Sequence, residues 1–233
     1  MTKAPSGSAG RRGLTVKLRN AGKRTPASQL WLKRQLNDPY VAAAQAQGWR
    51  SRAAFKLMEL DDKFTLLRPG MRVLDLGAAP GGWSQVAVRR GAAKVLGLDL
   101  LPMDPVPGAE FLQGDFNEPD MPERLIALMG GRADLVLSDM APNTTGHAAT
   151  DHLRIIALAE LALDFAARVL NPGGAFVAKV FQGGTEKLML APMKRMFTAV
   201  RHAKPPASRK ESSELYVVAT GFRGTSRPEP GSA

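Results

Sequence analysis

Four short apolar runs lie in the middle of the chain, and each contains or is closed by an aspartate or a glycine. Stretches with apolar residues at helical spacing lie between and around them, so strands and helices alternate. Parallel strands need crossovers of this kind, and the alternation therefore predicts an α/β fold with a parallel sheet and helices on both faces. The expected strands, including three later ones, cover residues 72–77, 95–99, 111–115, 135–139, 175–181, about 199–203 and 214–220.

The helix before the first strand is expected to start at Ser51, whose hydroxyl can cap the first turn. Its apolar stripe consists of Leu57, Leu60, Phe64 and Leu67. Lys56 lies at the margin of this stripe, so periodicity alone predicts a surface lysine at this position.

Several aspartates are placed where a parallel sheet binds its ligands. Asp75 lies within the first run, whereas Asp99, Asp115 and Asp139 fall at or near the ends of the next three. Ligands of open α/β sheets bind beyond the carboxyl ends of the strands, near the point where the strand order reverses. The sequence therefore predicts an acidic site at this edge of the sheet.

A glycine-rich loop, residues 77–83, follows the first strand and allows close approach of the backbone to a ligand at a helix N-terminus. The loop lacks the dinucleotide pattern G-x-G-x-x-G, because Ala79 replaces its second glycine. Asp99 lies 22 residues beyond Gly77, the usual distance for a carboxylate that binds ribose hydroxyls. The nearby acids, among them Asp115 as a partner for the adenine amino group, favour S-adenosylmethionine, with its sulfonium and amino groups. A dinucleotide remains the alternative.

Lys179 is unusual because it interrupts an apolar strand that should be buried on both faces. An unpaired ammonium group in such a place is costly, so the sequence predicts a carboxylate partner or a functional role. Asp139, at the end of the neighbouring strand, is the expected partner. Glu214, which opens the last strand, is a second candidate.

The distribution of charge suggests two kinds of ligand. The chain has 32 Lys and Arg against 21 Asp and Glu, a net charge of +11, which favours a polyanion such as nucleic acid or a membrane surface. Nine basic residues and no acid lie within residues 1–37, and seven more basic residues lie within residues 187–210. Residues 95–123 instead carry seven acids and no Lys or Arg. These segments predict separate sites for a polyanion and for a neutral or cationic ligand.

Length and composition suit one globular domain, expected over residues 31–222. Residues 1–30 are expected to form a flexible basic arm, and residues 223–233 a flexible tail. The chain has no cysteine and only three histidines, so we expect no disulfide and no metal site. It has no apolar run of the roughly 18 residues that span a membrane. We expect a cytoplasmic protein, with a mitochondrial transit peptide as the alternative for the arm.

Six sequence blocks together resemble the FtsJ family of ribosomal-RNA ribose 2′-O-methyltransferases, and most closely its bacterial members that act on large-subunit RNA. The resemblance runs in order from about residue 31 to residue 221, with an N-terminal arm longer than usual. Ala54 stands where relatives often have an aromatic residue. The blocks are SRAAFK at 51–56, DLGAAPGGWSQ at 75–85, DLLPM at 99–103, QGDF at 113–116, SDMAPN at 138–143 and KVFQG at 179–183.

The resemblance implies a Rossmann-like class I methyltransferase fold, with a mostly parallel seven-stranded sheet whose last strand is antiparallel. It implies a catalytic tetrad of Lys56, Asp139, Lys179 and Glu214. It also implies an S-adenosylmethionine site that includes Gly81, Trp83, Asp99, Asp115 and Asp139. The implied substrate is a uridine in the large-subunit RNA loop that receives the aminoacyl end of tRNA, reached within the 50S particle by a monomeric enzyme.

The chemistry of the reaction suggests a role for each tetrad residue. A ribose hydroxyl needs a base or a strong hydrogen-bond acceptor beside it, and a lysine is a base only when neutral. We therefore expect Lys179 to be the base, oriented by Asp139, with Lys56 beside it and Glu214 fixing Lys56 or the ribose.

Other readings of the sequence remain open. A catalytically silent RNA-binding module would keep the fold without the chemistry, although the complete tetrad argues against it. A methyltransferase acting on a base nitrogen is disfavoured because residues 138–142 read SDMAP, not Asn-Pro-Pro-aromatic. Enzymes that act on tRNA or on the mRNA cap share the tetrad, so the choice of RNA is left undecided.

Overall fold

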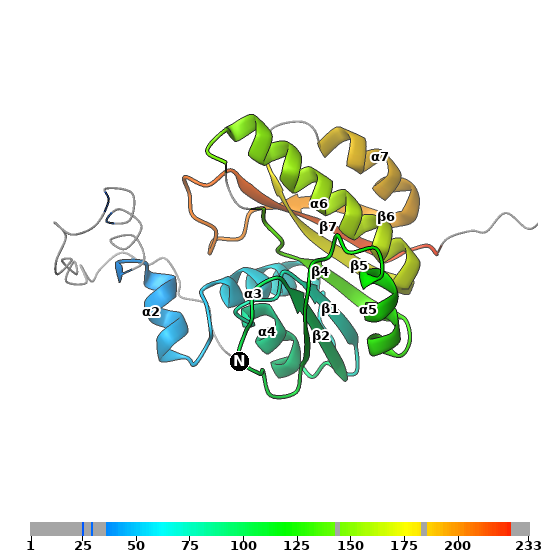
Figure 1. The fold of residues 1–233 in the computed structure, drawn as a ribbon, viewed down its shortest axis with the longest axis horizontal. Coiled ribbons are helices and arrows are strands. Elements are labelled where there is room, and N and C mark those ends of the chain that lie inside the picture. Colours follow the sequence, from blue (N-terminus) through cyan, green and yellow to red (C-terminus); the bar gives the residue numbers. More distant parts are fainter. Residues whose placement is uncertain (1–24, 26–28, 30–35, 143–144, 183–185, 225–233) are drawn as a thin grey trace, which may run out of the picture.

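A computed structural model describes residues 25, 29, 36–142, 145–182 and 186–224 of the chain (Figure 1). The predicted N-terminal arm and C-terminal tail therefore lie almost entirely outside the described residues. The strands are β1 Arg72–Leu76, β2 Lys94–Asp99, β3 Glu110–Gln113, β4 Ala133–Ser138, β5 Leu170–Phe181, β6 Phe197–Ala203 and β7 Glu214–Phe222. The helices are α2 Pro39–Ala46, α3 Ala53–Phe64, α4 Gly82–Arg89, α5 Met121–Met129, α6 Ala148–Val169 and α7 Glu186–Met196.

These strands form one sheet in the order β3-β2-β1-β4-β5-β7-β6. The pairs β1–β2, β1–β4, β2–β3 and β4–β5 are parallel, whereas β7 runs antiparallel to both of its neighbours. The expected seven-stranded, mostly parallel sheet with an antiparallel last strand is thus confirmed.

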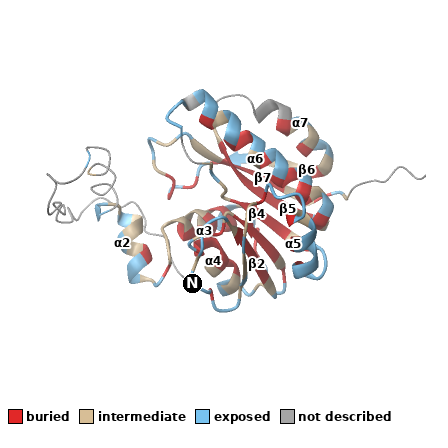
Figure 2. Ribbon diagram, in the orientation of Figure 1, coloured by how far each residue is buried: buried red, intermediate tan, exposed pale blue. Residues whose placement is uncertain are grey.

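The helices cover both faces of the sheet, as expected. On one face α3 and α4 bury Phe55 and Trp83 against the sheet, and on the other α5, α6 and α7 bury residues such as Met121, Phe165 and Met193. Figure 2 shows buried residues along the strands and on the helix sides that face them. None of the described helices is long and apolar enough to cross a membrane.

The strand order reverses between β1 and β4, and backbone hydrogen bonds join the strand ends there. The amide of Asp139 donates to the carbonyl of Leu76 at 3.0 Å. The amides of Gly77 and Ala78 donate to the carbonyl of Leu98 at 2.8 and 3.0 Å. The first residues after β1 and β4 are therefore fixed close together at the carboxyl edge, where a ligand site is expected.

Two local expectations were wrong. Helix α3 starts at Ala53, with no side-chain cap. Among the described residues the Ser51 hydroxyl has no hydrogen-bond partner, and it lies next to Gly82 at the start of α4. Strand β5 begins at Leu170, five residues earlier than expected, and the register shifts between Ala133 and Leu135 of β4. The shift accommodates the Asn-Pro-Gly-Gly turn sequence as a bulge.

Asp75 occupies a central strand and is fully buried. One of its oxygens accepts a hydrogen bond from the Ser84 hydroxyl at 2.7 Å, and the other has no partner among the described residues. Burial raises the pKa of Asp75 from its ordinary 3.8 to about 7, despite the hydrogen bond from Ser84, and the charges of Asp139 and Asp99 add to the rise.

This raised pKa predicts a specific pH dependence of stability. Between pH 3.8 and about 7 the folded protein keeps a proton on Asp75 that the unfolded chain releases, so stability from this group falls as the pH rises. Asp75→Asn cannot ionise, so relative to this variant the wild type should lose roughly 2–3 kcal/mol of unfolding free energy between pH 5 and 8. Denaturant unfolding of both proteins measures this difference, and a difference that does not change with pH would contradict the prediction.

Candidate functional site

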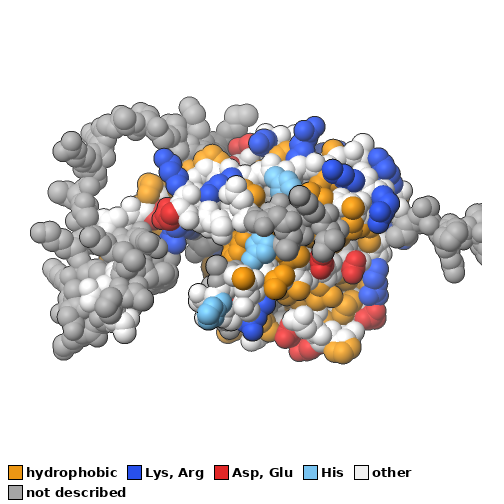
Figure 3. Space-filling model, turned by 90° about the horizontal axis from the view of Figure 1, so that it is seen from above, with side chains coloured by type: hydrophobic (Ala, Val, Ile, Leu, Met, Phe, Trp, Pro, Cys, Tyr) orange, Lys and Arg blue, Asp and Glu red, His pale blue; other side chains and the backbone are white. Residues whose placement is uncertain are grey.

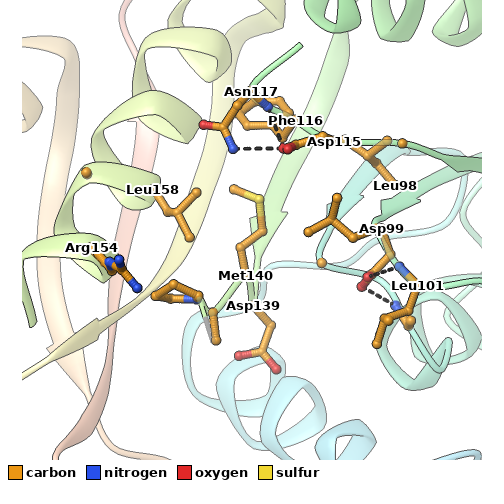
Figure 4. A pocket seen from close by; sticks show the side chains of 17 residues that line it. Leu98, Asp99, Leu101, Asp115, Phe116, Asn117, Asp139, Met140, Arg154 and Leu158 are labelled. Carbon is orange, nitrogen blue, oxygen red and sulfur yellow. Dashed lines mark hydrogen bonds between the residues drawn. The ribbon is translucent and has the colours of Figure 1, made fainter. Parts of the chain in front are cut away.

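A cavity of about 580 Å³ opens at the carboxyl edge of the sheet, between the ends of β1, β2, β3 and β4 and the side of α6. Figure 4 shows Asp99 and Leu101 on one side of it and Arg154 and Leu158 on the other. It lies where the strand order reverses, as the sequence predicts for the ligand site. It is lined by Gly77, Ala79, Leu98–Leu101, Gly114–Asn117, Asp139–Pro142, Arg154, Ala157 and Leu158.

Gly77 shapes the floor of this cavity. Its φ of +80° lies in the left-handed region that favours glycine. A Cβ built on it would lie 2.7 Å from the amide nitrogen of Met140 and 2.9 Å from its Cα. Any larger residue here would push apart the ends of β1 and β4, so Gly77 is required for the two chain segments to meet.

The carboxylates of Asp99 and Asp115 are oriented by hydrogen bonds at the cavity wall. Asp99 accepts from the amide of Ala79 at 2.8 Å and from the amide of Leu101 at 2.9 Å. Asp115 accepts from the amide and the side chain of Asn117 at 2.9 and 2.8 Å. Both carboxylates are therefore held at the carboxyl ends of their strands. Their oxygens can accept further hydrogen bonds from a ligand.

Lys179 meets the partner that the sequence predicts. Its ammonium nitrogen lies 3.0 Å from the Oδ1 atom of Asp139 and donates to the backbone carbonyl of the same residue at 2.6 Å. The Lys179 side chain is only 9% exposed, so this buried charge is compensated by a carboxylate and a carbonyl together. Asp139 also lines the cavity, which places the ion pair at its edge.

Tyr216 joins this pair to a second one, and sequence reasoning missed it. Its hydroxyl donates to Oδ1 of Asp139 at 2.8 Å and accepts from the ammonium of Lys56 at 3.2 Å. Lys56 in turn contacts the Oε1 and Oε2 atoms of Glu214 at 2.8 and 2.9 Å. The structure thus brings the four residues of the expected tetrad into one polar cluster, linked through Tyr216.

The expectation that Lys56 is a surface lysine was wrong, since its side chain is only 13% exposed. Helical periodicity identifies the side of α3 that packs on the sheet. It does not reveal that a second side packs against the start of β7. The family resemblance, which includes this lysine in the tetrad, locates it correctly.

Burial and the neighbouring charges shift the pKa of Asp139 and of Tyr216. Burial acts to raise the pKa of Asp139, but the ammonium groups of Lys179 and Lys56 and two hydrogen bonds outweigh it, so the pKa lies below its ordinary value. Burial raises the pKa of Tyr216 well above 10, and the carboxylates of Asp139 and Glu214 raise it further. At neutral pH Asp139 is therefore ionised and Tyr216 remains a neutral hydrogen-bond donor.

Gly81 and Trp83 are not among the described residues that line the cavity. Trp83 is 3% exposed, donates from its indole nitrogen to the carbonyl of Ala53 at 2.8 Å, and packs against the ring of Tyr216. Gly81 has a φ of +101°, and a Cβ on it would lie 2.7 Å from Val106. Their predicted contacts with a cofactor stay predictions.

The surface of the molecule carries both basic and hydrophobic side chains. Figure 3 shows Lys and Arg side chains along the margins of one face of the molecule, with hydrophobic side chains nearer its middle. Exposed basic residues of the second basic stretch include Lys194, Arg195, Arg201, Lys204 and Lys210. In the described part of the chain no group of three or more His, Asp or Glu is arranged to hold a metal ion.

Comparison with known proteins finds similarity to methyltransferases over most of the chain. The model of the FtsJ-like methyltransferase family matches residues 49–222. A Granulibacter bethesdensis protein named ribosomal RNA large subunit methyltransferase E is 75% identical over 214 residues, which cover 92% of this chain and 93% of that protein. A Gluconobacter oxydans protein of the same name is 71% identical, covering 91% of this chain and 79% of that protein.

Solved structures share the fold. A Plasmodium falciparum protein assigned as a ribosomal RNA methyltransferase is 33% identical, with a TM-score of 0.68, over 76% of this chain and 100% of that one. A Streptococcus thermophilus protein assigned as a hemolysin is 19% identical, with a TM-score of 0.52 over 78% of this chain and 70% of that one, and indicates the fold alone. With the family model matched from α3 to β7, this chain belongs to the FtsJ-like methyltransferase family.

Proposed function

We propose that this protein methylates large-subunit ribosomal RNA, transferring a methyl group from S-adenosylmethionine to the ribose 2′-hydroxyl of a uridine in the loop that receives the aminoacyl end of tRNA. The observation that carries the proposal is the position of Lys179 and Asp139 at the edge of an acidic cavity. The names of the close relatives support ribosomal RNA as the substrate. We further propose that it acts as a monomer in the cytoplasm, on RNA within the 50S particle.

The residues around the cavity fit the proposed donor. Asp99 would accept hydrogen bonds from the ribose hydroxyls, and Asp115 would accept one from the adenine amino group. Asp139 would face the positively charged end of the donor. Among the described lining residues the only cation is Arg154, so the cavity suits a cationic ligand better than a pyrophosphate. When bound, S-adenosylmethionine supplies an electrophilic methyl group on a sulfonium.

The protein's own contribution is to position and activate the RNA hydroxyl. Positioning supplies much of the acceleration of an in-line transfer. Lys179, in its neutral form, would accept the proton of the 2′-hydroxyl, and Asp139 would hold the Lys179 nitrogen in place at 3.0 Å. Lys56, fixed by Glu214 and Tyr216, would orient the hydroxyl from the other side.

An assay of radiolabelled methyl transfer to three substrates tests the function directly. The purified protein should methylate 50S particles or large-subunit RNA from a strain that lacks this modification, and should leave tRNA unmodified. Mapping of the product should identify a 2′-O-methyluridine. Methylation of tRNA alone, or of a base nitrogen, would overturn the proposal.

A second test concerns the donor. Asp99→Ala removes the carboxylate proposed to bind the ribose, and hydrogen bonds to a charged acceptor contribute roughly 1.5–3 kcal/mol. S-adenosylmethionine should therefore bind at least about tenfold more weakly to this variant in calorimetry. Glu110→Ala, an exposed acid on the neighbouring strand β3 that does not line the cavity, serves as the control and should bind normally. Unchanged donor affinity of Asp99→Ala, or tight binding of NAD by the wild type, would contradict the donor assignment.

The proposed base gives a third prediction. Lys179→Ala should abolish methyl transfer and leave a folded protein with near-normal donor affinity, because Gly77, Asp99 and Asp115 are unchanged. Lys56→Ala should slow transfer severely, whereas Lys63→Ala, an exposed lysine on the same helix, should not. The wild-type rate should rise with pH, because only the neutral amine accepts a proton. Robust methylation by Lys179→Ala would remove this residue from the mechanism.

A further inference from the structure

The loop of residues 204–213, which joins β6 to β7, reaches the polar cluster through one buried hydroxyl. Ser208 is 5% exposed, and its Oγ atom donates to Oε1 of Glu214 at 2.8 Å. The same oxygen accepts from the ammonium of Lys56 at 2.8 Å. The hydroxyl and the lysine therefore share one carboxylate oxygen at the start of β7.

This contact constrains the direction of the Glu214 carboxylate. Lys56 approaches both of its oxygens, at 2.8 and 2.9 Å, but a lysine ammonium on a long flexible stem fixes the plane of a carboxylate poorly. A hydroxyl on a short side chain has few rotamers and fixes the acceptor direction more closely. Ser208 thus supplies the directional contact that Lys56 cannot.

The backbone that carries Ser208 is itself clamped to α3. The amide of Ala207 donates to Oε2 of Glu59 at 2.7 Å, and its carbonyl accepts from the guanidinium of Arg52. Arg52, Lys56 and Glu59 are spaced by four and three residues, so they share one side of the helical segment, the side that faces this loop. Both backbone groups next to Ser208 are therefore held by the side of α3 that carries Lys56.

We infer that Ser208 is a positioning residue for methyl transfer: it fixes the carboxylate of Glu214, which in turn fixes the ammonium of Lys56 beside the Tyr216 hydroxyl. Ser208 is not among the residues that line the cavity, and in the described part of the chain its hydroxyl is hydrogen-bonded to Glu214, which does not line it either. Its effect must pass through Glu214. The inference rests on the proposed function, in which Lys56 orients the RNA hydroxyl.

The test compares three single substitutions in the full-length protein. Ser208→Ala removes the hydroxyl, and Ser208→Thr retains it. Ser212→Ala is the matched control, because the Ser212 hydroxyl belongs to the same loop but accepts a hydrogen bond from the backbone amide of Glu214, at 3.1 Å, and not one shared with its carboxylate. For each variant the measurements are the single-turnover rate at saturating donor and RNA, the affinities for both, and the thermal unfolding midpoint.

We expect Ser208→Ala to slow the single-turnover rate about tenfold, the effect of losing one hydrogen bond to a charged acceptor. Its affinities for donor and RNA and its unfolding midpoint should stay close to those of the wild type. Ser208→Thr should recover most of the rate, and Ser212→Ala should lose little of it. A crystal structure of Ser208→Ala should show the Glu214 carboxylate rotated and Lys56 displaced from the Tyr216 hydroxyl.

Other outcomes would overturn the inference. A wild-type rate in Ser208→Ala, an equal loss in Ser212→Ala, or an unmoved Glu214 carboxylate would show that Ser208 positions nothing. A loss confined to RNA affinity or to stability would make the residue part of the binding surface or of the scaffold. If the wild type itself leaves large-subunit RNA unmethylated, the proposed function fails, and the structure of Ser208→Ala still decides whether the hydroxyl orients Glu214.

Discussion

The buried ammonium of Lys179 is the constraint on which the arrangement of this site depends. A charge placed in a central strand is strongly destabilising unless it is paired and hydrogen-bonded, and here Asp139 provides a carboxylate and a carbonyl. Both contacts come from the residue after β4, so the end of that strand is fixed against β5. The same residue lines the cavity, and the pair therefore joins the cavity to the polar cluster behind it.

The strands, the layers and this ion pair could be predicted from the sequence because they follow from local rules. The apolar runs predicted where the strands lie. The free-energy cost of burying an unpaired cation indicated a partner for Lys179 at the end of a neighbouring strand. The burial of Lys56 and the role of Tyr216 do not follow from such rules. Both depend on the pairing register, in which Lys179 lies directly opposite Tyr216, and on a loop that packs against α3. Hydrophobic periodicity reveals neither the pairing register nor the packing of this loop.

Charge is divided between the cavity and the polar cluster in a way that suits two different ligands. Asp99 and Asp115 stand on the cavity side, and their orienting donors are neutral amides. In the polar cluster, the Tyr216 hydroxyl lies among two ammonium groups and two carboxylates, those of Lys56, Lys179, Asp139 and Glu214. Such a cluster carries no net charge when all four groups are ionised, so it can lie largely buried at the edge of the sheet.

The antiparallel direction of β7 is what completes the cluster. In a parallel strand the carboxyl end would lie at the ligand edge, and the first residue would lie at the opposite edge, a full strand length away. Because β7 runs antiparallel to β5, its first residue, Glu214, pairs with Phe181 at the end of β5. Tyr216 follows two residues later on the same face, opposite Lys179. The loop that precedes β7 must then also lie at this edge, which is why Ser208 comes within reach of Glu214. The reversal of one strand thus provides an acid, a phenol and a supporting hydroxyl at an edge where a parallel strand would provide only its last residues.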